Sequence, residues 1–360
     1  MKAVILVGGK GTRLLPITSH LPKALAPVLN EPFLFHVVRH LKRHNIDEII
    51  MAIGNLAGPI RESLGDGGRF GIKIDYALEH SPLGTAGAIK NAERFLDGTF
   101  IALNGDVFTD LDITALVNFH RRNRAAATIA LTEVEDNGAY GVVETDDSGR
   151  VTAFREKPKK GETDCRHINA GTYVLEPEVL TGIHPGVETS IERDVFPCLL
   201  PRGIYALASP AYWLDIGTPE KYLQVHRDLL SGKCCEYDPE GRRKGMIGEG
   251  TFIHPTAQLT GPVVIGPGCK IGPGVKLIGP AVIGPNCELM EDCVVSDSVV
   301  WPDTWIGPRA SVHSSIIADH CRIDHDSVID RSMLGCSVTV CAGHSVIPGS
   351  KINSGTKTGG

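Results

Sequence analysis

A six-residue repeat in the C-terminal third constrains the fold of this chain more than any other feature. Large aliphatic residues occupy every sixth position from Ile253 to Val295, Trp301 keeps the phase, and the repeat resumes with small shifts as far as Ile329. A fixed hexad of this kind is typical of a β-helix, in which each short strand forms one side of a triangular coil. Paired glycines and prolines would form the corners. We therefore predict a β-helix over residues 248–350.

The residue four positions after each aliphatic residue of the repeat is small. These positions hold Cys269, Val275, Ala281, Cys287, Cys293, Val299, Ala310 and Cys321. Small side chains fit the inside of a narrow prism, so we interpret most of the ten cysteines as small hydrophobic residues. No C-x-x-C pair occurs in the chain, and the spacing therefore gives no support to a zinc site.

Residues 1–230 have a different pattern, in which short apolar runs alternate with amphipathic stretches. The apolar runs KAVILV, EIIMAIG, KIDYAL, FIALNGD and AATIALTEV predict strands, and the stretches at 32–44, 85–95, 113–122 and 219–230 predict helices. Such alternation is typical of an α/β fold with a mostly parallel, Rossmann-like sheet and helices on both faces. The polar segment 231–247 is expected to be a linker, and residues 351–360 a flexible tail.

The composition excludes two classes of partner. A formal charge of −6 over 360 residues argues against a nucleic-acid binder or a protein that binds anionic membranes, since both normally carry a basic excess. No apolar run approaches the roughly 20 residues that span a bilayer. The N-terminal KAVILV leads directly into glycines, so we interpret it as a strand and not as a secretory signal. We expect a cytoplasmic protein.

The stretch GGKGTRLLPITSHLPK, residues 8–23, follows the first predicted strand. Ligands of parallel sheets bind beyond the carboxyl ends of the strands. Glycines let backbone N–H groups approach phosphate oxygens, Arg13 offers a fork of donors and Lys23 adds a point charge. The stretch is neither a Walker A loop nor a dinucleotide fingerprint, whose third glycine would fall on Leu14. A plain strand-to-helix turn with surface charges is the alternative.

These residues resemble the signature of the sugar-1-phosphate nucleotidyltransferases, the nucleotide-sugar pyrophosphorylases, whose form is G-x-G-T-R-L followed by P-K. Further elements of that family follow in order: PLGTAGA (82–88), NGD (104–106), YGVVE (140–144), FREKP (154–158), NAGTYVL (169–175) and WLDIGTPEKY (213–222). The hexad region is similar to the left-handed β-helix that many members carry. PLGTAGA is most similar to the GDP-mannose pyrophosphorylase subfamily.

The resemblance implies a reaction in which a sugar-1-phosphate oxygen attacks the α-phosphorus of a nucleoside triphosphate and pyrophosphate leaves. Positioning and charge neutralisation supply most of the catalysis of such transfers. By resemblance, Arg13 holds the leaving pyrophosphate and Lys23 neutralises the α-phosphate. Asp106 and Asp215 are implied to hold Mg²⁺, a cation that favours oxygen ligands together with substrate phosphates.

The resemblance also assigns the two substrate subsites. The nucleotide-binding residues are expected to be Gly8, Gly9, Gly11, Thr12, Arg13, Glu79, Gly84 and Thr85. The sugar-phosphate subsite is expected to comprise Gly141, Glu156, Lys157, Asn169 and Gly171. Glu79 and PLGTAG favour guanine as the base, so the expected reaction is that of GTP with mannose-1-phosphate.

Several alternatives stay open at this point. Asp106 could be a strand-end cap and Asp215 a helix cap, and Glu156-Lys157 could be an exposed pair in a hairpin. The reaction could instead be thymidylyl or uridylyl transfer to glucose-1-phosphate, or the chain could be a non-catalytic sensor of nucleotide-sugars. Hexad repeats also build acyltransferases, for which His313, His320 and His325 would be the candidate bases. We expect a homo-oligomer assembled through the β-helix, because an uncovered end of the prism needs a partner.

Overall fold

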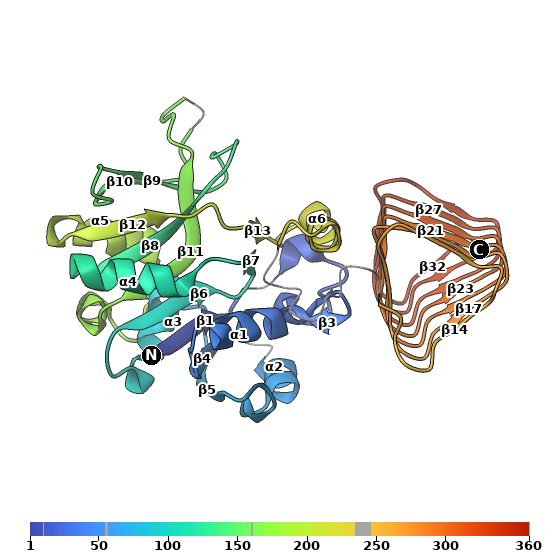
Figure 1. The fold of residues 1–360 in the computed structure, drawn as a ribbon, viewed down its shortest axis with the longest axis horizontal. Coiled ribbons are helices and arrows are strands. Elements are labelled where there is room, and N and C mark those ends of the chain that lie inside the picture. The colour runs from blue at the N-terminus through green and yellow to red at the C-terminus, as the bar shows by residue number, and fades with distance from the viewer. Residues whose placement is uncertain (10, 55–56, 160, 235–245, 360) are drawn as a thin grey trace. The chain divides into compact units, whose positions relative to one another are not determined.

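The computed structural model describes residues 1–9, 11–54, 57–159, 161–234 and 246–359 (Figure 1). The chain forms two compact units. The first comprises Met1–Gly9 and Leu34–Trp213, and the second comprises Lys10–Phe33 and Leu214–Gly360. None of the described helices has the length and apolar character that crossing a membrane requires.

The first unit is built on a nine-stranded sheet, whose main path runs β10-β9-β11-β6-β1-β4-β5. Its strands are β1 (Lys2–Leu6), β4 (Glu48–Ile53), β5 (Lys73–Leu78), β6 (Phe100–Asn104), β8 (Ala127–Glu133), β9 (Gly141–Thr145), β10 (Val151–Glu156), β11 (His167–Leu175) and β12 (Ile204–Ala208). The central strands β6, β1, β4 and β5 are parallel, and β11 joins β6 in the antiparallel direction. The carboxyl ends of β1, β5 and β6 therefore open toward one edge of the sheet, as the sequence predicts.

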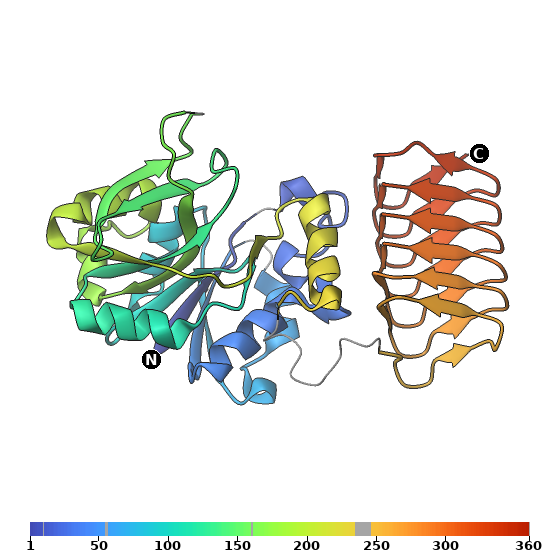
Figure 2. The ribbon, with the colours of Figure 1, turned by 45° about the horizontal axis from the view of Figure 1, so that its top comes forward.

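Helices cover both faces of this sheet, as Figures 1 and 2 show. They are α1 (Phe33–Arg43), α2 (Ala57–Leu64), α3 (Gly84–Asn91), α4 (Ile113–Asn123) and α5 (Phe196–Leu199). The alternation of side chains along β8 separates the faces. Thr128 bonds His120 of α4, at 2.9 Å between Oγ1 and Nδ1, whereas Ala127 and Ile129 pack into the core that contains α3 and α5.

Short helical turns complete the connections. They are the 3₁₀ turns Thr12–Leu14, Lys23–Leu25, Gly68–Phe70, Glu93–Phe95, Pro177–Gly182 and Leu200–Arg202, and a π-helical turn, Ile191–Val195. Strand β7 (Val107–Thr109) follows β6, and β13 (Trp213–Asp215) precedes α6 (Pro219–Ser231). All five strands and all four helices that the sequence predicts for this region are present, displaced by no more than a few residues.

His40 of α1 lies in the core of the first unit, 2 % exposed. Burial lowers its pKa from 6.5 to about 3, with a further contribution from the positive charges of His44 and Arg43. The folded unit thus holds this imidazole neutral, while the unfolded chain protonates it below pH 6.5. The unfolded state binds more protons between these two pKa values, so stability is lost as the pH falls from about 6.5 toward 3.

We expect the free energy of unfolding to fall by about 1.4 kcal/mol for each pH unit in this window through His40 alone. His40→Leu should flatten the dependence of the urea midpoint on pH between 6.5 and 4. The exposed His320 offers a matched control, His320→Gln, which should leave the slope as in the unmodified protein. An equal slope in His40→Leu and the unmodified protein would contradict this account.

The second unit contains the β-helix, whose three parallel sheets form the sides of a triangular prism (Figure 1). One sheet holds β14 (Phe252–Ile253), β17 (Lys270–Ile271), β20 (Glu288–Leu289), β23 (Trp305–Ile306), β26 (Arg322–Ile323), β29 (Thr339–Val340) and β32 (Lys357–Thr358). The next holds β15 (Gln258–Thr260), β18 (Lys276–Ile278), β21 (Val294–Ser296), β24 (Ser311–His313), β27 (Val328–Asp330) and β30 (Ser345–Val346). The third holds β16 (Val263–Ile265), β19 (Ala281–Ile283), β22 (Val299–Val300), β25 (Ile316–Ile317), β28 (Met333–Leu334) and β31 (Lys351–Ile352).

The shift in the repeat has a structural cause at one corner of the prism. Lys270 pairs with Glu288 and Glu288 with Trp305, so the coil shortens from 18 to 17 residues. Val300 then takes the inward position that the sequence assigns to Trp301. Trp301 lies outside the stack and is buried, and its Nε1 donates to the Tyr222 hydroxyl of α6 at 3.1 Å.

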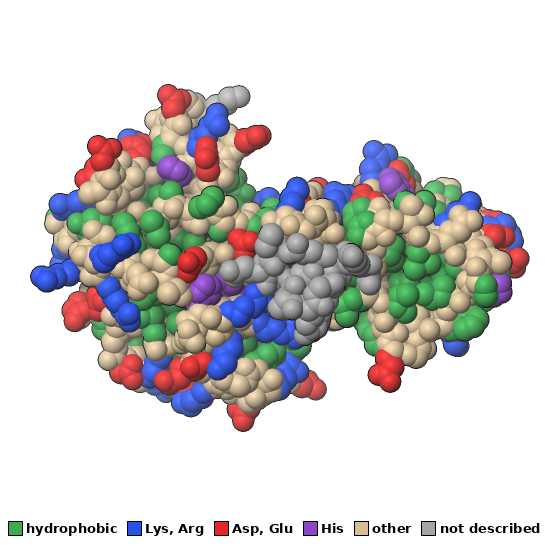
Figure 3. Space-filling view, in the orientation of Figure 1, with side chains coloured by type: hydrophobic (Ala, Val, Ile, Leu, Met, Phe, Trp, Pro, Cys, Tyr) green, Lys and Arg blue, Asp and Glu red, His purple; other side chains and the backbone are tan. Residues whose placement is uncertain are grey.

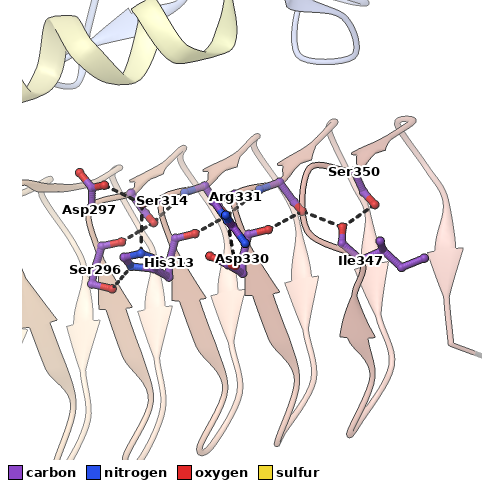
Figure 4. Close-up of polar contacts among 11 residues, drawn as sticks. Ser296, Asp297, His313, Ser314, Asp330, Arg331, Ile347 and Ser350 are labelled. Carbon is purple, nitrogen blue, oxygen red and sulfur yellow. Dashed lines mark hydrogen bonds and ion pairs between the residues drawn. The ribbon is translucent and has the colours of Figure 1, made fainter.

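Figure 4 shows a row of polar contacts along the shortened corner, where Asp297, Ser314 and Arg331 all adopt positive φ. Ser314 Oγ donates to Asp297 Oδ2 at 2.6 Å, and Asp297 also accepts two bonds from Arg227 of α6. His313 lies within hydrogen-bond distance of Ser296 and Ser314. This candidate base for acyl transfer is thus engaged by neighbouring side chains of the β-helix.

The inside of the prism has the composition that the repeat predicts. Cys269, Cys287, Cys293 and Cys321 are buried among the aliphatic residues, and every cysteine in the described ranges is a free thiol. The coil also continues past residue 350, where the sequence predicts a flexible tail. Strand β31 pairs with β28, and Ile352 packs on the apolar stack one coil above Leu334.

Lys10–Phe33, which carries the signature, and α6 contact the β-helix within the second unit. Lys351 Nζ donates to the Arg13 carbonyl at 3.2 Å, and Asn30 Nδ2 donates to the Ile283 carbonyl at 2.8 Å. The short hairpin of β2 (Pro27–Val28) and β3 (Glu31–Pro32) lies in the same segment, and Tyr222 of α6 donates to the Pro27 carbonyl. The linker predicted at 231–247 falls largely outside the described residues, because these exclude 235–245.

Candidate functional site

A cavity of about 400 Å³ lies in the first unit. The start of α3, the ends of β9 and β10, strand β11 and the π-helical turn all contribute to its lining. The lining residues are Gly84, Thr85, Ala139, Tyr140, Gly141, Glu156, Lys157, Asn169, Ser190, Glu192 and Arg193. Six of these residues are expected from the sequence to contact substrate, and they belong to both the nucleotide and the sugar-phosphate subsites. The structure thus brings together segments that lie as far as a hundred residues apart in the chain.

Glu156 ends strand β10 and Lys157 follows it, and both line this cavity. Glu156 lies against Gly141 of the paired strand β9, where an added Cβ would come within 2.7 Å of its Oε2. Burial, and then the negative charge of Glu192, raise the pKa of Glu156. Lys157 has a φ of 50°, in the left-handed region, and a side chain that is 66 % exposed. Its ammonium is therefore available to an incoming phosphate, while the strained backbone is of the kind found at functional sites.

A bulge in β11 presents Asn169 to the cavity. The register with β8 shifts between Asn169 and Tyr173. Gly171 sits in the bulge at a φ of 72°, and a Cβ there would lie 2.5 Å from Nδ2 of Asn104. Glycine is thus required at 171 both for its backbone conformation and for the close approach of the strand that leads to Asp106.

The PLGTAGA motif forms the first turn of α3, and its glycines have a packing role. A Cβ at Gly84 would lie 2.6 Å from the Thr189 carbonyl, and a Cβ at Gly87 would lie 2.6 Å from the Val187 carbonyl. The same Thr189 carbonyl accepts from the backbone N–H groups of Ala86 and Gly87. The motif therefore lets segment 187–190 lie across the start of the helix.

Gly8 and Glu79 follow β1 and β5 at the same edge of the sheet. A Cβ at Gly8 would lie 3.4 Å from both carboxylate oxygens of Glu79, and one at Gly9 would meet no described atom within 4 Å. Burial raises the pKa of Glu79, against a smaller lowering by the Leu83 N–H that bonds it. A half-buried carboxylate of this kind can accept hydrogen bonds from a ligand that presents N–H donors.

The charged residues of the signature cluster in the second unit. Gly11 has a φ of 60° and starts the turn that carries Thr12 and Arg13, both exposed. Lys23 Nζ lies 3.6 Å from Asp215 Oδ1, and Lys221 Nζ lies 3.5 Å from Asp215 Oδ2.

Gly217 brings Arg13 beside the same carboxylate. A Cβ at Gly217 would lie 2.6 Å from Arg13 Nη2 and 2.8 Å from Asp215 Oδ1. Three cations thus surround one aspartate, an arrangement suited to polyphosphate.

The two aspartates assigned to Mg²⁺ belong to different units. Asp215 Oδ1 is buried and accepts no hydrogen bond from the described residues, so it has free lone pairs for a cation. Asp106 lies two residues after β6, in the first unit. The described chain holds no group of three or more His, Cys, Asp or Glu side chains placed for a metal. One or two carboxylates are a usual protein contribution to a divalent cation whose shell is completed by phosphates and water.

Several residues of these two clusters were not assigned a role from the sequence. They are Tyr140, Ser190, Glu192 and Arg193 in the cavity and Lys221 beside Asp215. Lys221 lies within WLDIGTPEKY, so the motif itself could have marked it. Glu192 and Arg193 lie in the π-helical turn, a conformation that no residue pattern indicates and that is frequent at functional sites.

Comparisons with known proteins agree with this geometry. Residues 2–232 match the family described as Nucleotidyl transferase, and residues 243–355 match the GMPPB C-terminal domain. The chain is 40% identical over 268 residues to a mannose-1-phosphate guanylyltransferase of Mycobacterium tuberculosis, covering 73% of this chain and 74% of that protein. It is 37% identical to a UTP–glucose-1-phosphate uridylyltransferase of a Synechocystis species, over 90% of this chain and 89% of that one.

A solved structure of HddC from Yersinia pseudotuberculosis complexed with GMP-PN superposes with a TM-score of 0.54 and 31% identity. It covers 62% of this chain and 97% of that one. The resemblance read from GGKGTRL and the motifs after it is confirmed over both halves of the chain. This protein, with its β-helix of hexad repeats, belongs to the nucleotidyl transferase family.

Proposed function

We propose that this protein is a mannose-1-phosphate guanylyltransferase, which converts GTP and mannose-1-phosphate to GDP-mannose and pyrophosphate. The cavity of the first unit carries this proposal, because Gly141, Glu156, Lys157 and Asn169 all line it next to the start of α3. A cation at its mouth suits a sugar phosphate, and the carboxylate and amide suit sugar hydroxyls. The mannose-1-phosphate guanylyltransferases among its relatives support the choice of sugar and base.

The reaction needs charge neutralisation more than proton transfer. A phosphate oxygen of the sugar phosphate forms a bond to the α-phosphorus, and the bond from that phosphorus to the bridging oxygen of pyrophosphate breaks. The nucleophile is already an anion, so no general base is required. Lys157 binds the sugar phosphate, Lys23 neutralises the α-phosphate and Arg13 binds the departing pyrophosphate. Such preorganised charges are usually the largest contribution to a transfer of this type.

Asp106 and Asp215 are proposed to hold the divalent cation, with Mg²⁺ as the ion of choice for carboxylate and phosphate oxygens. The ion would supply further neutralisation of the triphosphate. Lys23 and Lys221 orient Asp215 through their ion pairs. Gly11 and Thr12 would place backbone N–H groups toward the phosphates.

Glu79 provides the argument for guanine. The edge of guanine presents the N1–H and N2–H donors, both of which one carboxylate can accept. Uracil and thymine present one N–H between two carbonyl oxygens, and the carbonyl oxygens would face the negative charge. Gly8 lies beside this carboxylate, since an added Cβ would be 3.4 Å from both of its oxygens. Uridylyl or thymidylyl transfer to glucose-1-phosphate is the alternative, supported by the Synechocystis relative.

A pyrophosphate-release assay tests the proposal. Four triphosphates (GTP, UTP, dTTP and ATP) would be combined with mannose-1-phosphate and with glucose-1-phosphate. We expect the highest kcat/KM for GTP with mannose-1-phosphate, and a reduced preference for GTP over UTP in Glu79→Gln, since an amide presents both a donor and an acceptor. A higher kcat/KM for UTP or dTTP with glucose-1-phosphate would establish the alternative.

We also propose that the protein is a homo-oligomer assembled through the β-helix. Figure 3 shows hydrophobic side chains gathered on the end of the β-helix that faces the viewer. In the first coil, the side chains of Leu259 and Phe252 are 39 % and 60 % exposed. The residues that occupy the position of Leu259 in later coils are buried. Light scattering should report a mass above that of one chain, and a monomer at micromolar concentration would contradict this. The cytoplasmic location stays a prediction.

A further inference from the structure

The carboxylate of Glu192 receives hydrogen bonds from both sides of the cavity. Its Oε2 accepts from Thr85 Oγ1 at 2.8 Å and from Ser190 Oγ at 2.7 Å. Its Oε1 accepts from the Tyr173 hydroxyl at 3.1 Å. Thr85 is in the first turn of α3, where the nucleotide is proposed to bind, whereas Tyr173 belongs to the strand that carries Asn169.

The contacts on the Tyr173 side form a relay with a fixed direction. Tyr173 is fully buried, and that burial, followed by the charge of Glu192, raises its pKa well above 10, so its hydroxyl stays a donor. An ionised carboxylate only accepts, so the hydroxyl points at Glu192 and offers its oxygen to Asn169 Nδ2 at 2.8 Å. The Gly171 N–H donates to Asn169 Oδ1 at 2.9 Å. The amide of Asn169 therefore has one possible orientation.

This orientation decides what Asn169 offers to a ligand. Its oxygen is engaged by Gly171 and one N–H by Tyr173, while its second N–H donates to none of the described residues and Asn169 lines the cavity. Asn169 thus offers a sugar hydroxyl in the cavity one N–H donor in a fixed orientation. A fixed donor discriminates between sugar hydroxyls by their position, because a hydroxyl elsewhere on the ring would leave it unpaired.

The contacts on the Thr85 side fix the start of α3 in the same way. The Thr85 hydroxyl donates to Glu192 and accepts from the Ile191 N–H at 2.8 Å, so it has no donor left for a ligand. Its role in nucleotide binding would then rest on its backbone. Glu192 lies in the π-helical turn, and Ser190 Oγ caps that turn by accepting from the Arg193 N–H.

We propose that Glu192 is a positioning residue that sets the donor of the sugar subsite through Tyr173 and the first turn of α3 through Thr85. The proposal rests on the proposed function and names the residue that organises its site. Glu192 is not a catalytic residue in this account, because its carboxylate is occupied by three protein hydroxyls. Its removal acts on how tightly each substrate binds.

Two variants separate the effect of Glu192 through Tyr173 from its effect through Thr85. Tyr173→Phe keeps the buried ring and removes the relay, so it should raise the KM for mannose-1-phosphate about tenfold, as expected for one lost hydrogen bond in a buried site. The KM for GTP should stay within about twofold. Glu192→Gln disturbs both branches, because its amide group places a donor where a hydroxyl already donates, and should raise both KM values. The double variant should raise the sugar KM no more than Glu192→Gln alone, since both substitutions break one relay.

Glu188→Gln is the matched control, because Glu188 is exposed in the same segment and should change neither KM. Calorimetric binding of mannose-1-phosphate in the presence of a non-hydrolysable GTP analogue gives a readout without turnover. Unmodified protein that binds no sugar phosphate would overturn the proposed function. If the unmodified protein binds mannose-1-phosphate and Tyr173→Phe binds it with unchanged affinity, the positioning role alone is overturned. Equal increases of the KM for mannose-1-phosphate and for GTP in Tyr173→Phe would overturn it as well.

Discussion

Replacing Arg13 by alanine is expected to lower kcat by about 10²–10³-fold, the range seen when one preorganised donor to a developing charge is removed. Arg13 is exposed on its turn, and its guanidinium lies against Gly217, where any side chain would collide with it. The guanidinium contributes little to the fold in that position. Its loss should act on the stage at which negative charge accumulates on the departing pyrophosphate, so kcat should fall more than the KM for GTP rises.

Pyrophosphate release at saturating concentrations of both substrates measures this effect. Arg13→Lys should recover part of the activity, since it keeps the charge and loses the fork of donors. Arg122→Ala, at an exposed arginine of α4, controls for the loss of a positive charge. A folded Arg13→Ala protein with kcat near that of the unmodified enzyme would remove this residue from the mechanism.

Replacing Asp215 by asparagine is expected to have an effect of similar size, on the order of 10²–10³-fold in kcat. Its Oδ1 is buried and receives no hydrogen bond from the part of the chain that the structure describes, while Lys23 and Lys221 lie within 4 Å of the carboxylate. The neutral amide removes a ligand of the proposed cation. This loss opposes binding of a metal–triphosphate complex.

Activity measured against Mg²⁺ concentration separates a lost ligand from a lost fold. The concentration for half-maximal activity should rise in Asp215→Asn, and also in Asp106→Asn, whereas Asp147→Asn at an exposed turn should match the unmodified protein. Direct titration with Mn²⁺ should show weaker binding in the two variants. Full activity of the unmodified enzyme in excess EDTA would contradict the metal assignment.

The fold was predictable where one short period repeats. The β-helix follows from the hexad because the inward position of each large aliphatic residue depends only on its place in the six-residue repeat. The exchange of Trp301 for Val300 was not predictable, because it depends on a coil that shortens by one residue and on the pairing of Trp301 with Tyr222, 79 positions away. Residues 351–358 were missed for a similar reason, since Ile352 is the only apolar residue there and the strands form by pairing with an earlier coil.

The candidate site was predictable where a contiguous motif carries it. Glu156, Lys157 and Asn169, which the resemblance assigns to the sugar-phosphate subsite, all line one cavity, and their contacts with substrate stay a prediction. Glu192 was not predictable, because its contacts join Thr85 and Tyr173, which are 107 and 19 positions away, and no local pattern records such bonds. For the glycines of PLGTAGA, the sequence showed the positions and left their structural reason open. Their spacing is visible in the sequence, but their packing against segment 187–190 is a tertiary property.

The contact between Lys351 and the Arg13 carbonyl has a consequence for biosynthesis. The two residues are 338 positions apart, so at about 5–20 residues per second the ribosome needs about 20–70 s to deliver the second after the first. The strands around the cavity are complete much earlier, because Trp213 ends their unit. The contact between the turn that carries Arg13 and the β-helix through Lys351 can therefore form only after the last coils have been synthesised. A chain released before Lys351 would contain every residue that lines the cavity and would lack this contact.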